Sequence, residues 1–402
     1  MQTLPAFLAR VTPPLTPALV VRRSALMRNL AAMQARCDAA GVALRAHGKM
    51  HKCSEVGRLQ VAGGAVGLCC QTVGEAEAFA AAGIDDLLVT APIAPWGAAR
   101  LAALVATGVR ISVVSDDDAQ VDRLAEAARA ADVVLNVVVD VDLGLHRAGC
   151  PPTEAVALAR RIATSNALRF DGVQAYLGHL QHLADLDARR SANEAATAIL
   201  AALVDSLNAE GLSPARVTGG GTGTFAYDLA AGVFTELQAG SYAFMDAEYD
   251  GCGAPDGEPW PFEPALFIAA SIVSAQHKTH VTNDAGLKAV AVDGPPAKVV
   301  AGAPEGSRWF SMGDEHGGIA HPATFQQFAA AARDALTRDR TITVIDSDPA
   351  VPWPADAPKS GDLVWLQPGH CDPTVNLYDA IFVADEDGTL ERWPIDARRV
   401  SG

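Results

Sequence analysis

Five side chains that can carry positive charge fall within eight residues near the start of the chain, in the segment 45–52 (Arg-Ala-His-Gly-Lys-Met-His-Lys). The segment follows an apolar run in a chain whose net charge is -16. If 42–49 is a strand, His47 and Lys49 lie on the same face, because side chains alternate along a strand. A lysine crowded by cations and partly removed from water loses its proton more readily, and a Schiff-base nucleophile needs a neutral amine. The segment therefore predicts a nucleophilic Lys49, with a solvated basic turn as the alternative.

Further polar residues follow later apolar segments. Arg147 comes after the run 133–142, and Tyr176 and His182 come after the run 170–177. Two segments rich in glycine and hydroxyl groups come later, and these are 218–224 (Thr-Gly-Gly-Gly-Thr-Gly-Thr) and 238–242 (Gln-Ala-Gly-Ser-Tyr). Successive glycines let backbone N–H groups converge on an anion, and hydroxyl groups add donors. We expect a phosphate site there, with a bare turn as the alternative.

A possible metal site lies late in the chain. His370 and Asp372 are two residues apart, so on an extended backbone they face one way and Cys371 faces the other. Histidine plus carboxylate suits a hard divalent ion such as Mn²⁺ or Mg²⁺. Two ligands are an incomplete set, which water or substrate would complete, and a structural pair is the alternative. The segment 314–317 (Asp-Glu-His-Gly) is expected either to supply outer partners to such a site or to form a polar turn.

The elements that must position these residues have a regular rhythm. Short apolar runs alternate with alanine-rich helical patterns at 74–82, 119–131, 153–164 and 188–210. Eight strands separated by helices predict a closed (β/α)₈ TIM barrel of the α/β class, with an open doubly wound sheet as the alternative. Such barrels carry their active sites at the carboxyl ends of the strands, and phosphate sites commonly follow strands seven and eight. The expected strands are 42–49, 65–71, 86–90, 109–115, 133–142, 170–177, 215–220 and 235–242.

After residue 246 the rhythm stops at a turn-rich segment, and a mainly β domain is expected. The division is an N-terminal segment 1–22 that pairs with the β domain, a barrel at 23–246, and the β domain at 247–402. One helix is expected at 323–337. The expected strands of this domain are 266–274, 287–292, 298–301, 341–344, 362–366 and 380–383.

Bulk composition limits the class of protein. Half of the residues are hydrophobic and 19% are charged, which is typical of a folded chain, and the net charge of -16 argues against nucleic acid as the main partner. The seven cysteines form no Cys-x-x-Cys pair, so they suggest neither a zinc ribbon nor a disulfide framework. We find no signal peptide and no apolar stretch of about 18 residues, and therefore expect a cytoplasmic protein without a membrane partner.

These features together resemble the fold-type III pyridoxal-phosphate enzymes, the alanine racemase group. Within it they resemble the D-threonine aldolase and D-serine dehydratase branch, which carries an Arg-Pro-His-x-Lys-x-His-Lys element. Arg45, His47, Lys49, His51 and Lys52 agree with that element, whereas residue 46 is alanine where proline is usual. The resemblance extends over 219–223, 236–242, 314–317 and 370–374, and so covers nearly the whole chain.

The resemblance implies how a pyridoxal 5'-phosphate cofactor is held. Lys49 would bind it covalently as a Schiff base. Arg147 is similar to the arginine that faces the pyridine nitrogen, and because an arginine keeps its proton, the ring nitrogen would stay neutral. The further residues expected at the cofactor are Thr218, Gly221, Thr222, Gln238, Gly240, Ser241 and Tyr242, of which Gly221, Thr222, Gly240 and Ser241 would contact the phosphate.

The resemblance also implies a divalent ion and a reaction. The aldolases of this branch use His-x-Asp and the dehydratases use His-x-Cys with zinc, so His370 and Asp372 favour an aldolase, although Cys371 stands one residue early for the dehydratase pattern. Mn²⁺ is the expected ion, with Mg²⁺, Co²⁺ and Zn²⁺ as alternatives. The ion would bind the substrate β-hydroxyl, and His182 or a water on the ion would accept its proton. For Tyr176, a catalytic and a purely structural role are both open.

The expected activity is retro-aldol cleavage of D-3-hydroxyamino acids, such as D-threonine, to glycine plus an aldehyde. One alternative is a D-serine or 3-hydroxyaspartate dehydratase that yields a 2-oxo acid plus ammonia. Another is a 3-hydroxyaspartate aldolase that yields glycine plus glyoxylate. A cofactor-carrying protein without turnover is a reading of a different class, against which the β domain and the His370–Asp372 pair count. The partner is a small-molecule substrate, and relatives with this architecture imply a homodimer.

Overall fold

Two compact units divide the chain in this computed structural model, which describes residues 3–277, 279–322, 325 and 357–398. The sheet unit comprises Met1–Leu26, Phe244–Glu248 and Pro264–Trp393, and the barrel unit comprises Met27–Ala243, Tyr249–Glu263 and Pro394–Gly402. Compared with the division at residues 22 and 246 drawn from the sequence, the structure adds the segments 249–263 and 394–402 to the barrel unit. No hydropathy pattern in the sequence indicates that these two short segments belong to the barrel unit.

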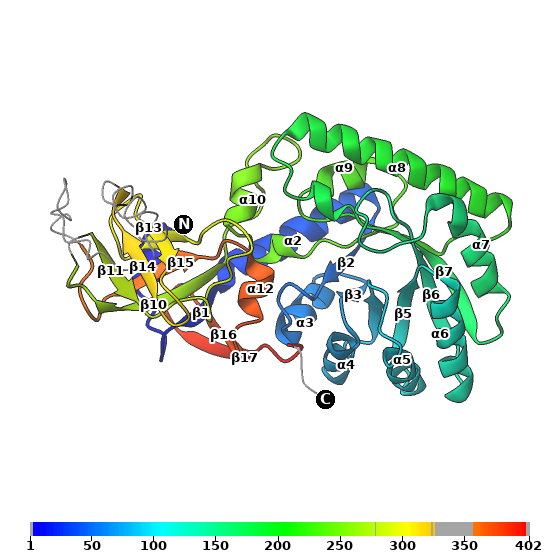
Figure 1. Cartoon of the computed structure of the whole chain (residues 1–402), viewed down its shortest axis with the longest axis horizontal. Helices are drawn as coiled ribbons and strands as arrows, with labels where there is room; N and C mark the ends of the chain where they lie inside the picture. The colour runs from blue at the N-terminus through cyan, green and yellow to red at the C-terminus, as the bar shows by residue number, and fades with distance from the viewer. Residues whose placement is uncertain (1–2, 278, 323–324, 326–356, 399–402) are drawn as a thin grey trace, which may run out of the picture. The chain divides into compact units, whose positions relative to one another are not determined.

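The barrel unit is a closed barrel of eight parallel strands, which confirms the predicted fold. Every predicted strand of this unit is present, with ends that differ by a few residues, and Figure 1 shows the helices around the outside of the strands. The strands are β2 (Ala43–His47), β3 (Gly67–Cys70), β4 (Asp86–Val89), β5 (Arg110–Ser115), β6 (Leu135–Asp140), β7 (Leu168–Ala175), β8 (Arg216–Gly219) and β9 (Glu236–Leu237).

The helices between the strands begin where the sequence provides caps. Thr72 accepts the N–H of Glu75 at the start of α4, and Asp117 accepts the N–H of Gln120 at the start of α6. The four helices expected between the barrel strands are present. No helix in the described part of the chain is both long and apolar enough to cross a membrane. The helices are α2 (Arg23–Ala40), α3 (Ser54–Ala62), α4 (Val73–Ala81), α5 (Gly97–Ala106), α6 (Asp118–Ala130), α7 (Pro152–Ala163), α8 (Leu186–Ala209) and α9 (Phe225–Ala230), with the short elements η1 (Gly178–Leu180), η2 (Ser241–Ala243) and α10 (Ala247–Cys252).

The first and last barrel strands are shorter than predicted. β2 ends at His47, and residues 48–51 form a turn. A Cβ at Gly48 would lie 2.6 Å from Phe79 Cε2, so only glycine fits where the chain leaves the strand. Lys49 therefore lies in the turn after the strand and does not share a strand face with His47, contrary to the expectation from alternation. At the other end, η2 replaces the last residues of the expected strand 235–242.

The described residues of the sheet unit form one nine-stranded sheet in the order β11-β14-β13-β12-β15-β10-β1-β16-β17, and a further pairing joins β11 to β10. β1 pairs with β10 and with β16, so the N-terminal segment is part of this sheet. The elements are α1 (Leu4–Leu8), β1 (Ala18–Arg22), β10 (Leu266–Ser274), β11 (His280–Asn283), β12 (Lys298–Ala301), β13 (Arg308–Ser311), β14 (Gly317–Ala320), β15 (Leu363–Gln367), α12 (Cys371–Val375), β16 (Ala380–Ala384) and β17 (Leu390–Pro394).

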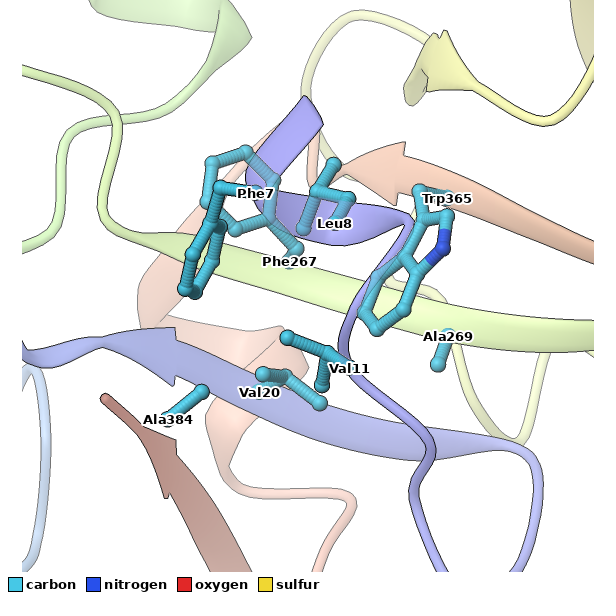
Figure 2. Packing of buried hydrophobic residues seen from close by; sticks show 8 residues of the cluster. All are labelled: Phe7, Leu8, Val11, Val20, Phe267, Ala269, Trp365 and Ala384. Carbon is cyan, nitrogen blue, oxygen red and sulfur yellow. The ribbon is translucent and has the colours of Figure 1, made fainter. Parts of the chain in front are cut away.

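The core of the sheet unit lies between the N-terminal helix and the sheet. Figure 2 shows Phe7 and Leu8 of α1 beside side chains of β1, β10 and β15. Burial of side chains this large contributes about 1.5–3 kcal/mol each relative to leaving them exposed. The cluster consists of Phe7, Leu8, Val11, Val20, Phe267, Ala269, Trp365 and Ala384.

Two features of this unit differ from the sequence prediction. The expected strand 287–292 is wrong, because the N–H groups of Ala289 and Val290 both donate to the carbonyl of Gly286 and close a turn. The short strands β11, β13, β14 and β17 were not expected, since four or five residues carry too little alternation to detect. The expected strand 341–344 and the expected helix 323–337, apart from Phe325, lie outside the described residues.

A buried ion pair closes the barrel. Arg45 of β2 is 1% exposed and donates from Nε and Nη2 to the two carboxylate oxygens of Glu236 of β9, at 2.9 and 3.0 Å. Its Nη1 donates to Asp86 Oδ1 at 2.8 Å. Burial alone lowers the pKa of Arg45, but the two carboxylates more than offset burial and raise it. The pair thus joins the first and the last strand.

Replacement of Glu236 tests this closure. Glu236→Ala leaves the guanidinium of Arg45 buried without its bidentate partner, and we expect a loss of about 3–5 kcal/mol in the free energy of unfolding. The measurement is equilibrium denaturation in urea. Glu77→Ala is the matched control, because it removes an exposed pair with Arg100 and is expected to cost about 1 kcal/mol or less. Equal losses in the two variants would contradict the assignment.

Candidate active site

The second lysine of the basic segment is committed to a carboxylate. Lys52 donates to Glu75 Oε1, and the side chain of Glu75 is 1% exposed. The other oxygen of Glu75 accepts the N–H of Gln71 at 2.7 Å. The ammonium group of Lys52 therefore anchors α4 to the turn after β2, and this structural role separates it from Lys49.

The histidine at the end of β2 holds the turn that carries Lys49. His47 Nδ1 accepts the backbone N–H of Lys49 at 3.4 Å, and Nε2 lies 3.1 Å from the hydroxyl of Thr90. Burial, with the positive charge of Lys49 next in size, lowers the pKa of His47 well below its usual range. The ring is therefore neutral, with its proton on Nε2. His51 is also buried and accepts the N–H of Cys53 on its Nδ1 at 3.1 Å.

Three of the expected catalytic residues come together at the carboxyl ends of β2, β6 and β7. Lys49 Nζ lies 6.0 Å from the centroid of the Tyr176 ring, and the guanidinium carbon of Arg147 lies 5.6 Å from the same centroid. Lys49 and Tyr176 are half-buried, whereas Arg147 is exposed. Two cations over one aromatic ring are attracted by its π-electrons, so Tyr176 helps to hold both side chains at the barrel mouth.

The two loops expected to bind phosphate are joined to each other. Thr222 Oγ1, after β8, accepts the N–H of Tyr242, after β9, at 3.0 Å. Among the described residues, the backbone N–H groups of Thr222, Gly240 and Ser241 have no acceptor in the chain. Unused N–H donors on adjoining loops fit an anionic ligand such as the phosphate of pyridoxal phosphate.

The glycines of these loops are required by close packing. A Cβ at Gly221 would lie 2.4 Å from Gln181 Oε1, and a Cβ at Gly240 would lie 3.1 Å from His47 Cβ. Gly240 thus lies beside His47, the last residue of β2, and the turn that carries Lys49 begins at the next residue. This proximity allows one cofactor to reach both the loops and Lys49, which is the fit that the resemblance requires.

Two further residues expected at the cofactor belong to a buried polar chain that links four strands. Gln238 Nε2 donates to Thr218 Oγ1 and to Gln174 Oε1, both at 3.0 Å, and Gln174 Nε2 donates to Asp140 Oδ1 at 2.9 Å. Burial raises the pKa of Asp140 to about 6. Sequence reasoning did not single out Gln174 or Asp140, because each lies within an apolar strand pattern that carries no signal for its polar contacts.

Tyr242 supports the loop from the core. Its side chain is fully buried, its hydroxyl accepts from Gln60 Nε2 at 3.2 Å, and its ring packs against Phe262. Burial raises the pKa of its phenol group. Since its backbone N–H is bonded to Thr222 as well, the contacts of Tyr242 are those of a residue that positions the loop.

His182 follows η1, between β7 and α8. Its half-buried ring packs edge-on against Tyr249, with 4.5 Å between ring centroids, and Tyr249 packs against Trp260. The aromatic contacts fix the plane of the imidazole. These contacts could not be predicted from the sequence, because Tyr249 and Trp260 lie in the short segment 249–263, which belongs to the barrel unit.

In the sheet unit, His370 and Asp372 lie at the start of α12 and not on an extended strand. His370 has extended backbone angles, and the proline at position 373 suits the first turn of a helix. The side chains still converge, because His370 Nε2 lies 4.0 Å from Asp372 Oδ1. Cys371 is fully buried, and its backbone N–H donates to Asp246 at 2.9 Å.

The surroundings of His370 fit a ligand to a divalent ion. Its Nδ1 lies 2.8 Å from Asp293 Oδ2, and such an outer carboxylate directs the Nε2 lone pair toward a metal. Within the residues that the structure describes, no group of three His, Cys, Asp or Glu side chains has the geometry of a metal site. His370 and Asp372 are two candidate ligands, and an ion bound there would take its other ligands from water or substrate.

Asp293 is the outer partner that sequence reasoning missed. It is 77 residues from His370, and no motif spacing connects them. The segment 314–317 does not serve in that place. Residues 314–316 form an exposed turn between β13 and β14, where Glu315 pairs with Lys288 at 2.5 Å, and Gly317 is the buried first residue of β14. Of the two expectations for this segment, an outer partner of the metal site or a polar turn, the structure therefore favours the polar turn.

Family comparisons agree with the two-part architecture. The model of the alanine racemase N-terminal domain matches residues 21–248, and that of a putative serine dehydratase domain matches residues 265–384. A similar curated protein is 3-hydroxy-D-aspartate aldolase of Paracoccus denitrificans, which is 38% identical over 390 residues and covers 95% of this chain and 92% of its own.

Solved structures lead to the same group. D-threonine aldolase from Filomicrobium marinum is 34% identical, with a TM-score of 0.84 over 95% of each chain. A variant of D-threo-3-hydroxyaspartate dehydratase, solved in a metal-free form, is 26% identical, with a TM-score of 0.79 over 96% of this chain and 98% of its own. The chain therefore belongs to the alanine racemase N-terminal domain family, in the group that includes D-threonine aldolase and 3-hydroxy-D-aspartate aldolase.

Proposed function

We propose that the protein is a lyase that depends on pyridoxal phosphate and a divalent metal ion and cleaves D-3-hydroxyamino acids to glycine and an aldehyde. The observation that carries the proposal is the place of Lys49, beside Tyr176 and Arg147 at the barrel mouth, while the neighbouring Lys52 is paired with Glu75. The similarity to two aldolases over 95% of the chain supports the same reaction class.

In this proposal the barrel unit holds the cofactor. Lys49 would be the covalent attachment point, the N–H groups of Thr222, Gly240 and Ser241 would bind the phosphate, and Arg147 would face the ring nitrogen. When bound, pyridoxal phosphate accepts the electron pair released from the Cα–Cβ bond. The neutral His47 holds the Lys49 turn through the backbone and does not add a positive charge beside the amine.

The sheet unit supplies the metal ligands. His370 and Asp372 would bind the ion, with Asp293 orienting His370. When bound, a divalent ion lowers the pKa of a coordinated hydroxyl group. We assign to it the β-hydroxyl of the substrate, with Mn²⁺ as the expected ion. The relative that was solved in a metal-free form supports a metal site in this group.

His182 is the proposed general base. Its plane is fixed by Tyr249, and neutral imidazole can accept a proton near neutral pH. Removal of the hydroxyl proton lets the Cα–Cβ bond break, so that the β-carbon leaves as the aldehyde and Cα gains a proton to give glycine. A water on the ion remains the alternative base.

The residue at the second metal-ligand position favours an aldolase over a dehydratase, because the aldolases that this chain resembles use His-x-Asp and the dehydratases use His-x-Cys. Here Asp372 lies 4.0 Å from His370 Nε2, whereas the neighbouring Cys371 is fully buried. The dehydratase reading stays as the second candidate because a dehydratase shares the fold. A cofactor carrier without turnover has no use for the metal ligands of the sheet unit. A homodimer and a cytoplasmic location stay predictions.

Product identity tests the proposed reaction. Incubation with D-threonine or D-3-hydroxyaspartate in the presence of Mn²⁺ is expected to give glycine plus acetaldehyde or glyoxylate, because the Cα–Cβ bond breaks. D-serine serves as the substrate that a dehydratase converts to pyruvate. Ammonia plus a 2-oxo acid, without glycine, would replace the proposal with the dehydratase reading.

Metal removal tests the sheet-unit ligands. Chelation is expected to abolish the activity of the native protein, and added Mn²⁺ is expected to restore it. Added Mn²⁺ is not expected to restore activity in His370→Ala or Asp372→Ala, because each variant lacks one of the ligands. His316→Ala is the matched control in the exposed turn and is expected to behave like the native protein. Full activity after exhaustive chelation would exclude the metal from the reaction.

The base assignment makes a separate prediction. His182→Ala is expected to lower kcat by about 100-fold or more, because proton transfer from the hydroxyl then has no positioned acceptor. His179→Ala, which changes an exposed histidine in η1, is the control. A near-normal rate for His182→Ala would assign the base to a metal-bound water.

A further inference from the structure

A buried carboxyl group lies in contact with the glycine loop 218–224. Asp228 of α9 is 1% exposed, and its Oδ2 accepts the N–H of Gly221 at 3.2 Å and the hydroxyl of Thr224 at 2.6 Å. Gly220 has a φ of 71°, and a Cβ there would lie 2.5 Å from Asp228 Oδ2. The shape of the loop therefore depends on this carboxyl group.

The second carboxyl oxygen faces α8. Asn193, which is also 1% exposed, donates from Nδ2 to Asp228 Oδ1 at 2.7 Å. In the described part of the chain, the Oδ1 atom of Asn193 is buried and has no hydrogen-bond partner. If Asp228 Oδ1 carries a proton, a 180° rotation of the amide lets Asn193 accept it. The surroundings thus accommodate both protonation states of Asp228.

No charged side chain of the described residues compensates Asp228. Burial raises its pKa to about 6, and its three hydrogen bonds offset only part of that rise. Charged groups on the elements around α9 have other contacts. On α8, Arg189 donates to the carbonyl of Gly223 at 3.0 Å and Arg190 lies over the ring of Tyr227. Arg36 of α2 lies over the ring of Phe225, and Glu236 of β9 is paired with Arg45.

A negatively charged carboxylate repels a phosphate group that binds close to it. Asp228 accepts the N–H of Gly221, and the N–H of the next residue, Thr222, is one that we assign to the phosphate. We propose that Asp228 is a positioning residue for the cofactor phosphate, and that the glycine loop binds phosphate more tightly when Asp228 carries a proton. This inference rests on the proposed function, because it takes the loop as the phosphate site of pyridoxal phosphate.

The sign of the pH effect follows from the raised pKa. Asp228 keeps its proton up to about pH 6, so its negative charge develops as the pH rises through that value. Asp228→Asn keeps an oxygen acceptor for Gly221 and Thr224 but carries no charge. The variant and the native protein should therefore bind phosphate alike at low pH and differ at high pH.

The test compares two ligands of the full-length protein after its cofactor has been removed. Kd is measured for pyridoxal phosphate and for pyridoxal, which lacks the phosphate, between about pH 5 and pH 8. The ratio of the two Kd values measures the contribution of the phosphate group, because a change in covalent attachment at Lys49 affects both ligands alike. The titration of the phosphate group itself is common to all variants.

We expect the phosphate contribution to be about tenfold larger in Asp228→Asn than in the native protein at high pH, and equal at low pH. Asp171→Asn is the control, because it removes a buried carboxyl group that is bonded to Ser112 and Arg216 and not to the loop. An equal phosphate contribution at every pH, or the same change in Asp171→Asn, would overturn the inference.

A second variant keeps the test decisive if Asp228→Asn does not fold. Asn193→Leu removes a hydrogen bond that favours the charged carboxylate, so the midpoint of the pH effect should move upward. An unchanged midpoint in a folded Asn193→Leu protein counts against the inference. If the native protein binds neither ligand, the proposed function fails; normal binding without any effect of Asp228 overturns this inference alone.

Discussion

The ion pair between Arg45 and Glu236 is the interaction on which the candidate active site depends. β2 and β9 pair at only two positions, Ala43 with Glu236 and Leu44 with Leu237. The buried bidentate pair adds a strong contact where the backbone ladder is short. The Lys49 turn follows β2 and the Gly240 loop follows β9, so the closure brings the amine and the unused N–H groups of Gly240 and Ser241 to the same end of the barrel.

The residues of the basic segment 45–52 have different functions. The resemblance to one contiguous motif could suggest five residues around a cofactor, but the structure assigns Arg45 to barrel closure and Lys52 to Glu75. His47 is neutral and holds the turn. The motif is therefore mostly scaffold, and its residues keep Lys49 in one place.

The barrel was predictable from sequence because strands buried on both faces read as apolar runs, as in β6, and helices between them read as alanine-rich periods. The carboxyl-end positions of Lys49, Arg147 and Tyr176 followed from the same rhythm. Contacts between distant residues were not predictable. Asp293 beside His370 and Asn193 beside Asp228 depend on tertiary packing, and neither spacing nor periodicity encodes such pairs.

We assign the covalent attachment of the cofactor to Lys49 and not to Lys52. Borohydride reduction of the holoenzyme would fix the cofactor to the amine that bears it, and peptide mass spectrometry would then identify the modified residue. We expect a reduced pyridoxyl phosphate group on Lys49, with Lys52 unmodified. Modification of Lys52, or of no lysine in the barrel, would contradict it.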